Sequence, residues 1–149
     1  MSLASPPATV RVDASLSEAA RRMGRAHVGS LVVVDDAGPV GLVTDRDVVL
    51  AACLREPDAA APQVGEVASR PLVTLAANAP LDALTALCAQ RCIRRVGLVD
   101  EAGALVGVVA VDSVVQYLGG QLGDLARALG REFAEERAPT ATQRTFGPE

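Results

Sequence analysis

GLVTDRD, residues 41–47, ends an apolar run with a cluster of polar and charged side chains. The Gly-Leu-Val segment is typical of a buried strand, and Val48-Val49-Leu50 begins an apolar helical segment directly after it. Thr44 and Asp47 have the spacing of a helix cap, in which each side chain bonds the backbone N–H of the other residue. The same cluster also suits a bound ligand, so a capping and a binding interpretation are both open.

The binding interpretation rests on the junction between the strand and the helix. A helix N-terminus has unpaired backbone N–H groups and a dipole that favours an anion, so a phosphate could lie close to Thr44 and Asp45. Asp47 is an acceptor-only carboxylate, which suits the two hydroxyls of a sugar. Taken alone, residues 41–47 favour capping over binding.

The chain is a tandem duplication. GSLVVVDDAG at 29–38 corresponds to RRVGLVDEAG at 94–103, and VRVDASLSEAARRM at 10–23 corresponds to VTLAANAPLDALTALC at 73–88. Such self-similarity indicates repeated structural units. Each copy is predicted to contain a short strand, a helix, two strands joined by an acidic turn with glycine, and a second helix.

Two helices have further signals in the sequence. Ser15 and Glu18 have the spacing of a capping box, which predicts that the first helix starts after Ser15. Beyond Gly119-Gly120, an added helix is predicted whose apolar face requires a partner surface on its own chain or on a second one. That face consists of Leu122, Leu125, Ala126, Leu129 and Phe133.

The composition excludes several classes of function. The chain has 149 residues, of which 50% are hydrophobic and 21% charged, and this predicts a globular protein with a substantial core. Its net charge of -4 argues against nucleic-acid binding, which needs clustered cations. All 14 basic residues are arginine, which excludes Schiff-base lysines and the Gly-Lys-Ser/Thr phosphate loop. The single histidine, His27, is predicted to be a partly exposed helix-end residue, and we expect no catalytic site.

Cysteine usage and hydropathy address metal, redox and membrane chemistry. The three cysteines, at 53, 88 and 92, lie in predicted helices, so we expect neither a disulfide nor a metal site, and small-residue packing is the preferred interpretation. The N-terminal MSLASPP lacks the features of a signal peptide. The apolar run ALVGVVAV at 104–111 is too short to span a bilayer, so we expect a cytoplasmic protein without membrane contact.

The phrases GSLVVVDDAGPVGLVTDRDVV and IRRVGLVDEAGALVGVVAVDSVV resemble a pair of cystathionine β-synthase (CBS) domains, over about residues 8–118. The resemblance implies an α+β fold of two βαββα repeats packed with pseudo-twofold symmetry, here followed by an added C-terminal helix. The corresponding division of the chain is repeat 1 at 1–56, a linker at 57–62, repeat 2 at 63–118, the added helix at 119–137 and a flexible tail at 138–149. The family's lead-in segment matches VGEVASRP at 64–71, whereas repeat 1 has only MSLASPP in that place.

The resemblance also implies a function. CBS pairs generally bind AMP, ADP, ATP or S-adenosylmethionine in clefts between the repeats and regulate an attached or partner protein. We therefore expect a regulatory sensor that is not an enzyme, forms a homodimer and acts on an unknown protein target. The alternative is a structural dimerisation module without a ligand.

The ribose signature of the family, Gly-apolar-x-Thr/Ser-x-x-Asp/Asn, falls on Gly41, Thr44 and Asp47. In this frame one side chain can both cap the helix and face a cleft. The second copy departs from the signature, because Ala110 and Ser113 occupy the Thr and Asp positions. We therefore expect at most one good nucleotide site per chain.

Other candidate site residues follow from family analogy. Arg94 and Arg95 occupy a position that often carries phosphate-binding cations, although an exposed strand edge or an intersubunit ion pair would also explain them. Because no aromatic residue precedes Tyr117, adenine would lie between aliphatic side chains. The complete set of predicted ligand-binding residues is Val10, Val12, Gly29, Ser30, Thr44, Arg46, Asp47, Arg94 and Arg95.

Overall fold

The computed structural model of the chain describes residues 3–56 and 58–137, with side chains up to residue 132. Repeat 1 contains β2 (Thr9–Arg11), α1 (Leu16–Ala26), β3 (Ser30–Asp35), β4 (Gly38–Thr44) and α2 (Asp45–Cys53). Repeat 2 contains β5 (Thr74–Ala76), α4 (Leu81–Arg91), β6 (Arg95–Val99), β7 (Leu105–Ala110) and α5 (Val111–Arg137). The predicted order of elements is confirmed in both copies, and two short lead-in elements, β1 (Ala4–Ser5) and α3 (Val64–Val67), precede them.

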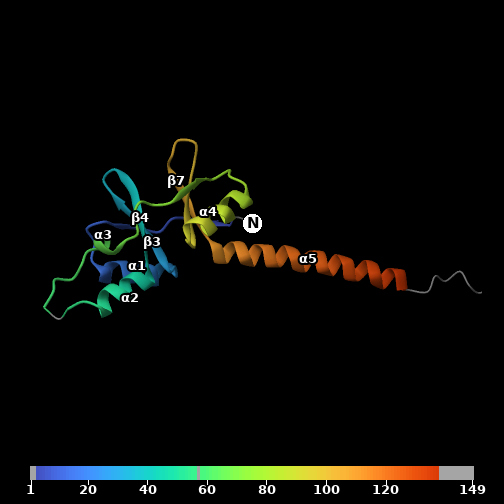
Figure 1. Cartoon of the computed structure of the whole chain (residues 1–149), viewed down its shortest axis with the longest axis horizontal. Helices are drawn as coiled ribbons and strands as arrows, with labels where there is room; N and C mark the ends of the chain where they lie inside the picture. The colour runs from blue at the N-terminus through green and yellow to red at the C-terminus, as the bar shows by residue number, and fades with distance from the viewer. Residues whose placement is uncertain (1–2, 57, 138–149) are drawn as a thin grey trace, which may run out of the picture. The chain divides into compact units, whose positions relative to one another are not determined.

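Each repeat is built on a small sheet. In repeat 1, β3 is central, parallel to β2 and antiparallel to β4. In repeat 2, β6 is likewise parallel to β5 and antiparallel to β7. Figure 1 shows α1 and α2 beside β3 and β4, and these helices contact one another as well as the strands. The core of repeat 1 forms where the apolar sides of the strands and α1 meet.

The lead-in segment of each repeat packs on the other repeat. β1 pairs in antiparallel fashion with β7, joining residues 4–5 to the sheet of repeat 2. In the reciprocal contact, the Ser69 N–H donates to the Leu42 carbonyl at 2.9 Å, and the Leu42 N–H donates to the Ser69 carbonyl at 3.0 Å. Val64 of α3 is fully buried in the core of repeat 1. The repeats are thus joined by backbone bonds and by a shared core.

Gly41 permits the close approach of the second lead-in segment. A Cβ atom at this position would lie 2.7 Å from the Ser69 carbonyl oxygen and 2.9 Å from the Arg70 Cγ. The nearer atom belongs to the backbone and is fixed by its bond to Leu42, so it could not move aside easily. The glycine of the sequence signature therefore has a packing role between the repeats.

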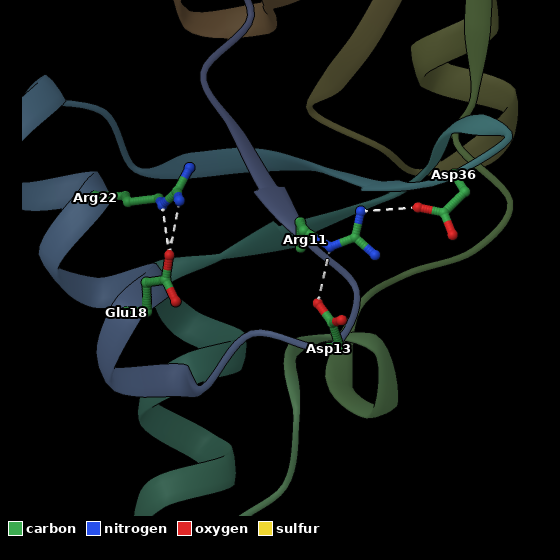
Figure 2. Close-up of polar contacts among 5 residues, drawn as sticks. All are labelled: Arg11, Asp13, Glu18, Arg22 and Asp36. Atoms are coloured by element: carbon green, nitrogen blue, oxygen red, sulfur yellow. Dashed lines mark hydrogen bonds and ion pairs between the residues drawn. The ribbon is translucent and has the colours of Figure 1, made fainter.

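The start of α1 differs in part from the prediction. The Glu18 N–H donates to the Ser15 Oγ at 3.2 Å, which confirms Ser15 as the N-cap. The Glu18 carboxylate does not complete a capping box, because it accepts two hydrogen bonds from the guanidinium of Arg22, the shorter at 2.7 Å (Figure 2). The i,i+4 ion pair on the helix surface thus takes the carboxylate that the box would have used.

A second polar cluster joins β2 to the turn between β3 and β4. The Arg11 guanidinium donates to Asp13 at 3.1 Å and to Asp36 at 3.0 Å (Figure 2). The hydrogen bond from Arg11 lowers the pKa of the Asp13 carboxyl below its ordinary value. All three side chains are well exposed, so this bridge orients the turn and contributes little to stability.

The C-terminal part of the chain is one helix rather than two. α5 runs for 27 residues and continues through Gly119 and Gly120, where the sequence predicted a break before an added helix. Within the described residues, those from 112 to 137 form a unit separate from those up to Val111. Among the helices of the described residues, none combines the length and hydropathy that a membrane span requires. The tail predicted at 138–149 lies outside the described residues.

The buried Val64 provides a test of the shared core. Val64→Ala removes two buried methyl groups and should lower the free energy of unfolding by about 2 kcal/mol, measured by urea denaturation. Val49→Ala on α2, where the side chain is 58% exposed, is the matched control and should change it by less than about 0.5 kcal/mol. Equal effects of the two substitutions would contradict the packing of α3 in repeat 1.

Candidate functional site

Thr44 and Asp47 form a complete capping box at the start of α2. The Thr44 N–H and Oγ1 both donate to the Asp47 Oδ2, at 2.8 and 2.7 Å, and the Asp47 N–H donates to the Thr44 Oγ1 at 3.2 Å. The capping interpretation of residues 41–47 is therefore confirmed. These bonds fix the orientation of Thr44 at the end of β4.

A cleft of about 420 Å³ lies beside this cap, within the range of small-molecule sites. Repeat 1 lines it with Leu42, Thr44, Asp45 and Arg46, from the end of β4 and the first turn of α2. Repeat 2 contributes two segments, the lead-in residues 69 and 71–73 and the residues 92–95 that enter β6. The cleft therefore exists only because the lead-in of repeat 2 lies against β4.

The wall of the cleft is aliphatic. Its apolar side chains come from β4, from the second lead-in segment and from the residue before the arginine pair; they are Leu42, Pro71, Leu72, Val73 and Ile93. No aromatic side chain is among its lining residues. A planar ring would therefore be held here by aliphatic packing, as the sequence suggested, although by other residues than those proposed.

Charged groups from both repeats meet at the polar side of the cleft. Arg46 follows the cap, and Arg94 and Arg95 come from the start of β6. The half-buried Arg95 places its Nη2 atom 3.2 Å from the position that a Cβ on Gly29 would occupy, and the Asp45 Oδ2 lies 3.3 Å from the same position. Any side chain at residue 29 would therefore press on both groups, so Gly29 leaves room for this pair.

The segment that carries the arginines begins with an unusual backbone. Cys92 ends α4 in the left-handed conformation with a φ of 52°, and the Ile93 N–H then donates to the Cys88 carbonyl at 3.1 Å. His27 ends α1 in the same way, also with a φ of 52°; its position at the helix end is as predicted, and it is exposed rather than partly exposed. The two copies thus share this turn.

All three cysteines are free thiols, and burial raises the pKa of the Cys88 thiol, in keeping with a packing role.

The structure brings together four of the nine predicted ligand-binding residues: Thr44, Arg46, Arg94 and Arg95 all line the cleft. Asp47 does not line it. Its Oδ2 accepts both bonds from Thr44, and the residue borders a separate groove between α2 and residues 54–56 and 59–62.

The other four predicted residues lie outside the cleft lining. Val10 is 1% exposed in the core of repeat 1, and Val12 packs against that core while its carbonyl accepts from the Gly65 N–H at 2.8 Å. Gly29 borders the polar side of the cleft, as described above, and Ser30 pairs with Thr44 in the sheet. Val10 and Val12, the predicted adenine contacts, therefore do not line this cleft, because their side chains pack in or against the core of repeat 1.

Sequence reasoning missed Asp45 as a lining side chain, along with Ser69 and residues 71–73. The sequence signal for Asp45 was its position as a charged residue directly after Thr44. The lead-in residues had a weaker signal, the correspondence of ASPP at 4–7 with ASRP at 68–71. That correspondence does not indicate which repeat each lead-in contacts.

The sequence profile of the CBS domain family matches residues 2–53 and 64–120. The chain belongs to the CBS domain family. The CBS domain-containing protein YhcV of Bacillus subtilis (strain 168) is 38% identical over 104 residues, which are 70% of this chain and 73% of that protein. The inosine-5'-monophosphate dehydrogenase of Mycobacterium leprae is 32% identical over 112 residues, or 74% of this chain, but only 20% of that enzyme is covered.

Solved CBS pairs share the fold. The CBS domain pair of protein MJ0100, solved in complex with 5-methylthioadenosine and S-adenosyl-L-methionine, superimposes with a TM-score of 0.69 at 25% identity. The match covers 78% of this chain and 91% of that one. The CBS-domain containing protein ATU1752 from Agrobacterium tumefaciens has a TM-score of 0.65 at 28% identity, covering 74% of this chain and 82% of that one.

The cap at Thr44 can be tested separately from ligand binding. Thr44→Val keeps the side-chain shape but removes the hydroxyl that accepts from Asp47 N–H, and should lower the free energy of unfolding by about 1–2 kcal/mol in urea denaturation. Thr85→Val is the control, since its hydroxyl donates to the Asp82 carbonyl inside α4 and caps no helix. We expect a change below about 0.5 kcal/mol for the control. If Thr44→Val leaves the free energy of unfolding unchanged, the cap does not stabilise α2.

Proposed function

We propose that the cleft between the CBS repeats binds one adenosine nucleotide per chain and that the protein is a regulatory sensor without catalytic activity. One observation carries the proposal: Thr44 of the repeat 1 signature lines the same cleft as the arginine pair of repeat 2. A helix N-terminus and guanidinium groups that border one cleft with an aliphatic wall suit a phosphate joined to an apolar base.

Comparison of the two copies supports a single site. In the paired strands, Ser30 lies opposite Thr44 in repeat 1, and Arg95 lies opposite Ala110 in repeat 2. A counterpart cleft would therefore combine Ala110 with Ser30, which provide neither the signature hydroxyl nor a cation. The signature residue of repeat 1 and the arginines of repeat 2 border one cleft. The substituted positions, Ala110 and Ser30, would border the other.

The lining residues suggest a role for each part of a nucleotide. The phosphate would lie near the first turn of α2, within reach of Arg95. The Asp45 carboxylate, which lines the cleft, would accept hydrogen bonds from the ribose hydroxyls. Adenine would pack between Leu72 and Ile93. Asp47 acts in this scheme as a positioning residue, because its bonds orient Thr44.

The charge of the cleft favours phosphorylated ligands. Three arginines line it against the single carboxylate of Asp45. The sulfonium of S-adenosylmethionine is a cation and would be repelled, whereas the phosphates of AMP, ADP or ATP would be attracted. Protein MJ0100 was solved with S-adenosylmethionine and 5-methylthioadenosine, which supports an adenosine ligand, and we propose that this chain prefers the phosphorylated class.

A regulatory role requires a partner that responds to the ligand. The ligand can shift an equilibrium only through its different affinities for two arrangements of the protein. We propose that these are two arrangements of a homodimer and that the output passes to another protein.

The charge argument predicts a ranking of ligands. By titration calorimetry, ATP and ADP should bind the full chain more tightly than S-adenosylmethionine. Arg95→Gln should weaken ATP binding by roughly tenfold to a hundredfold, because a charge-assisted bond contributes about 1.5–3 kcal/mol. Arg21→Gln on the exposed surface of α1 removes the same charge away from the cleft and should leave the affinity unchanged.

The same titrations separate the competing interpretations. If no adenosine ligand produces heat, the chain is a structural dimerisation module and the sensor proposal is wrong. If Arg21→Gln weakens ATP binding as much as Arg95→Gln does, then ATP binds through the overall charge of the protein and not at a defined phosphate site. Tighter binding of S-adenosylmethionine than of ATP would contradict the role of the arginines.

A further inference from the structure

A narrow row of apolar side chains runs along α5. Its members alternate by three and four residues and are all exposed in the single chain: Val115 (63%), Leu118 (45%), Leu122 (69%), Leu125 (64%) and Leu129 (54%). Strict alternation of three and four gives a period of 3.5 residues, which is the spacing of a two-stranded coiled coil. We call these five residues the α5 seam.

The residues that flank the seam are small or uncharged. Gly119, Gln121, Ala126 and Ala128 occupy the positions next to the apolar row on the helix, where longer charged side chains would hold a partner helix away. The charged residues lie outside these positions, and Arg127 and Asp124 form an ion pair on the helix itself. Two such helices could therefore approach closely without burying a charge.

The glycine content indicates that α5 depends on a contact outside itself. Gly119, Gly120 and Gly130 have open space where a Cβ would lie, and Gly123 has only the Arg127 Nη1 atom, at 3.6 Å. Each glycine inside a helix disfavours the helix relative to alanine. Most helical stability in proteins comes from packing of an apolar face, and the seam is the apolar face that α5 offers.

We propose that the α5 seam binds the same seam of a second copy of this chain, so that a pair of α5 helices joins two protomers. A second copy presents the same 3.5-residue spacing, so its side chains can interdigitate along the whole row. A globular groove would instead favour a wider apolar face with a 3.6-residue period. A membrane surface would favour a cationic polar face, whereas Arg127 and Arg131 are offset here by Asp124 and Glu132.

The row also has a defined end. The next position in the alternation after Leu129 is Glu132, an exposed acid. This limits the contact to little more than two heptads. The inference deepens the homodimer of the proposed sensor by naming its contact, and it does not require that any nucleotide binds.

Light scattering of the full chain tests the seam. The wild-type protein should have twice the chain mass of 15.3 kDa. The double variant Leu118→Glu/Leu125→Glu places two acids in the seam and should reduce the mass to that of one chain. The control Gln116→Glu/Gly123→Glu adds the same charge to α5 outside the seam and should keep the mass of the dimer.

Three results would overturn the inference: a monomeric wild type, a dimeric seam variant, or a monomeric control. Circular dichroism and the thermal transition establish that each variant is folded, and if the double variant is not, the single variant Leu122→Gln replaces it with the same expected loss of dimer. ATP titration of the folded monomer separates the two proposals. Retained binding with a lost dimer supports both, and absent binding in every variant contradicts only the nucleotide site.

Discussion

The exchange of lead-in segments between the two repeats is the contact on which the rest of the structure depends. Residues 4–5 extend the sheet of repeat 2, while Ser69 binds Leu42 of repeat 1 through two backbone hydrogen bonds. Val64 fills the core of repeat 1 from the same segment. Without this exchange, residues 69–73 would not lie across the end of β4, and the cleft would lose one of its walls.

Divergence of the two duplicated copies explains why the proposed site combines different side chains from each repeat. The cleft takes its helix N-terminus from repeat 1 and its strand entry from repeat 2. Here repeat 1 keeps Thr44, repeat 2 keeps Arg94 and Arg95, and these meet in the same cleft. The losses at Ala110 and Ser113 affect the opposite combination. An asymmetric protein thus arises from a symmetric fold through a few side chains.

Much of the fold was predictable because its signals are local or repeated. The duplication indicated the βαββα order, and Thr44 and Asp47 had the spacing of the cap that they form. Side-chain competition was harder to predict: Glu18 binds Arg22 rather than closing a capping box. The break expected at Gly119 does not occur either, because two glycines disfavour a helix without ending it.

The site was predicted only in part, for a related reason. Thr44, Arg46, Arg94 and Arg95 follow from the position of each residue within its own repeat. The remaining walls depend on which repeat each lead-in segment contacts, and a single sequence contains no such information. Val10 was assigned to the ligand by analogy, whereas its burial in the core follows from tertiary packing.

The number of nucleotides bound per chain tests the central claim most directly. Native mass spectrometry of the full chain with saturating ATP would count them without assuming an affinity. The proposed single site, which combines Thr44 with Arg94 and Arg95, predicts one nucleotide per chain. Two per chain would show that the degenerate half also binds and would contradict the account, as would a chain that remains empty with every adenosine nucleotide.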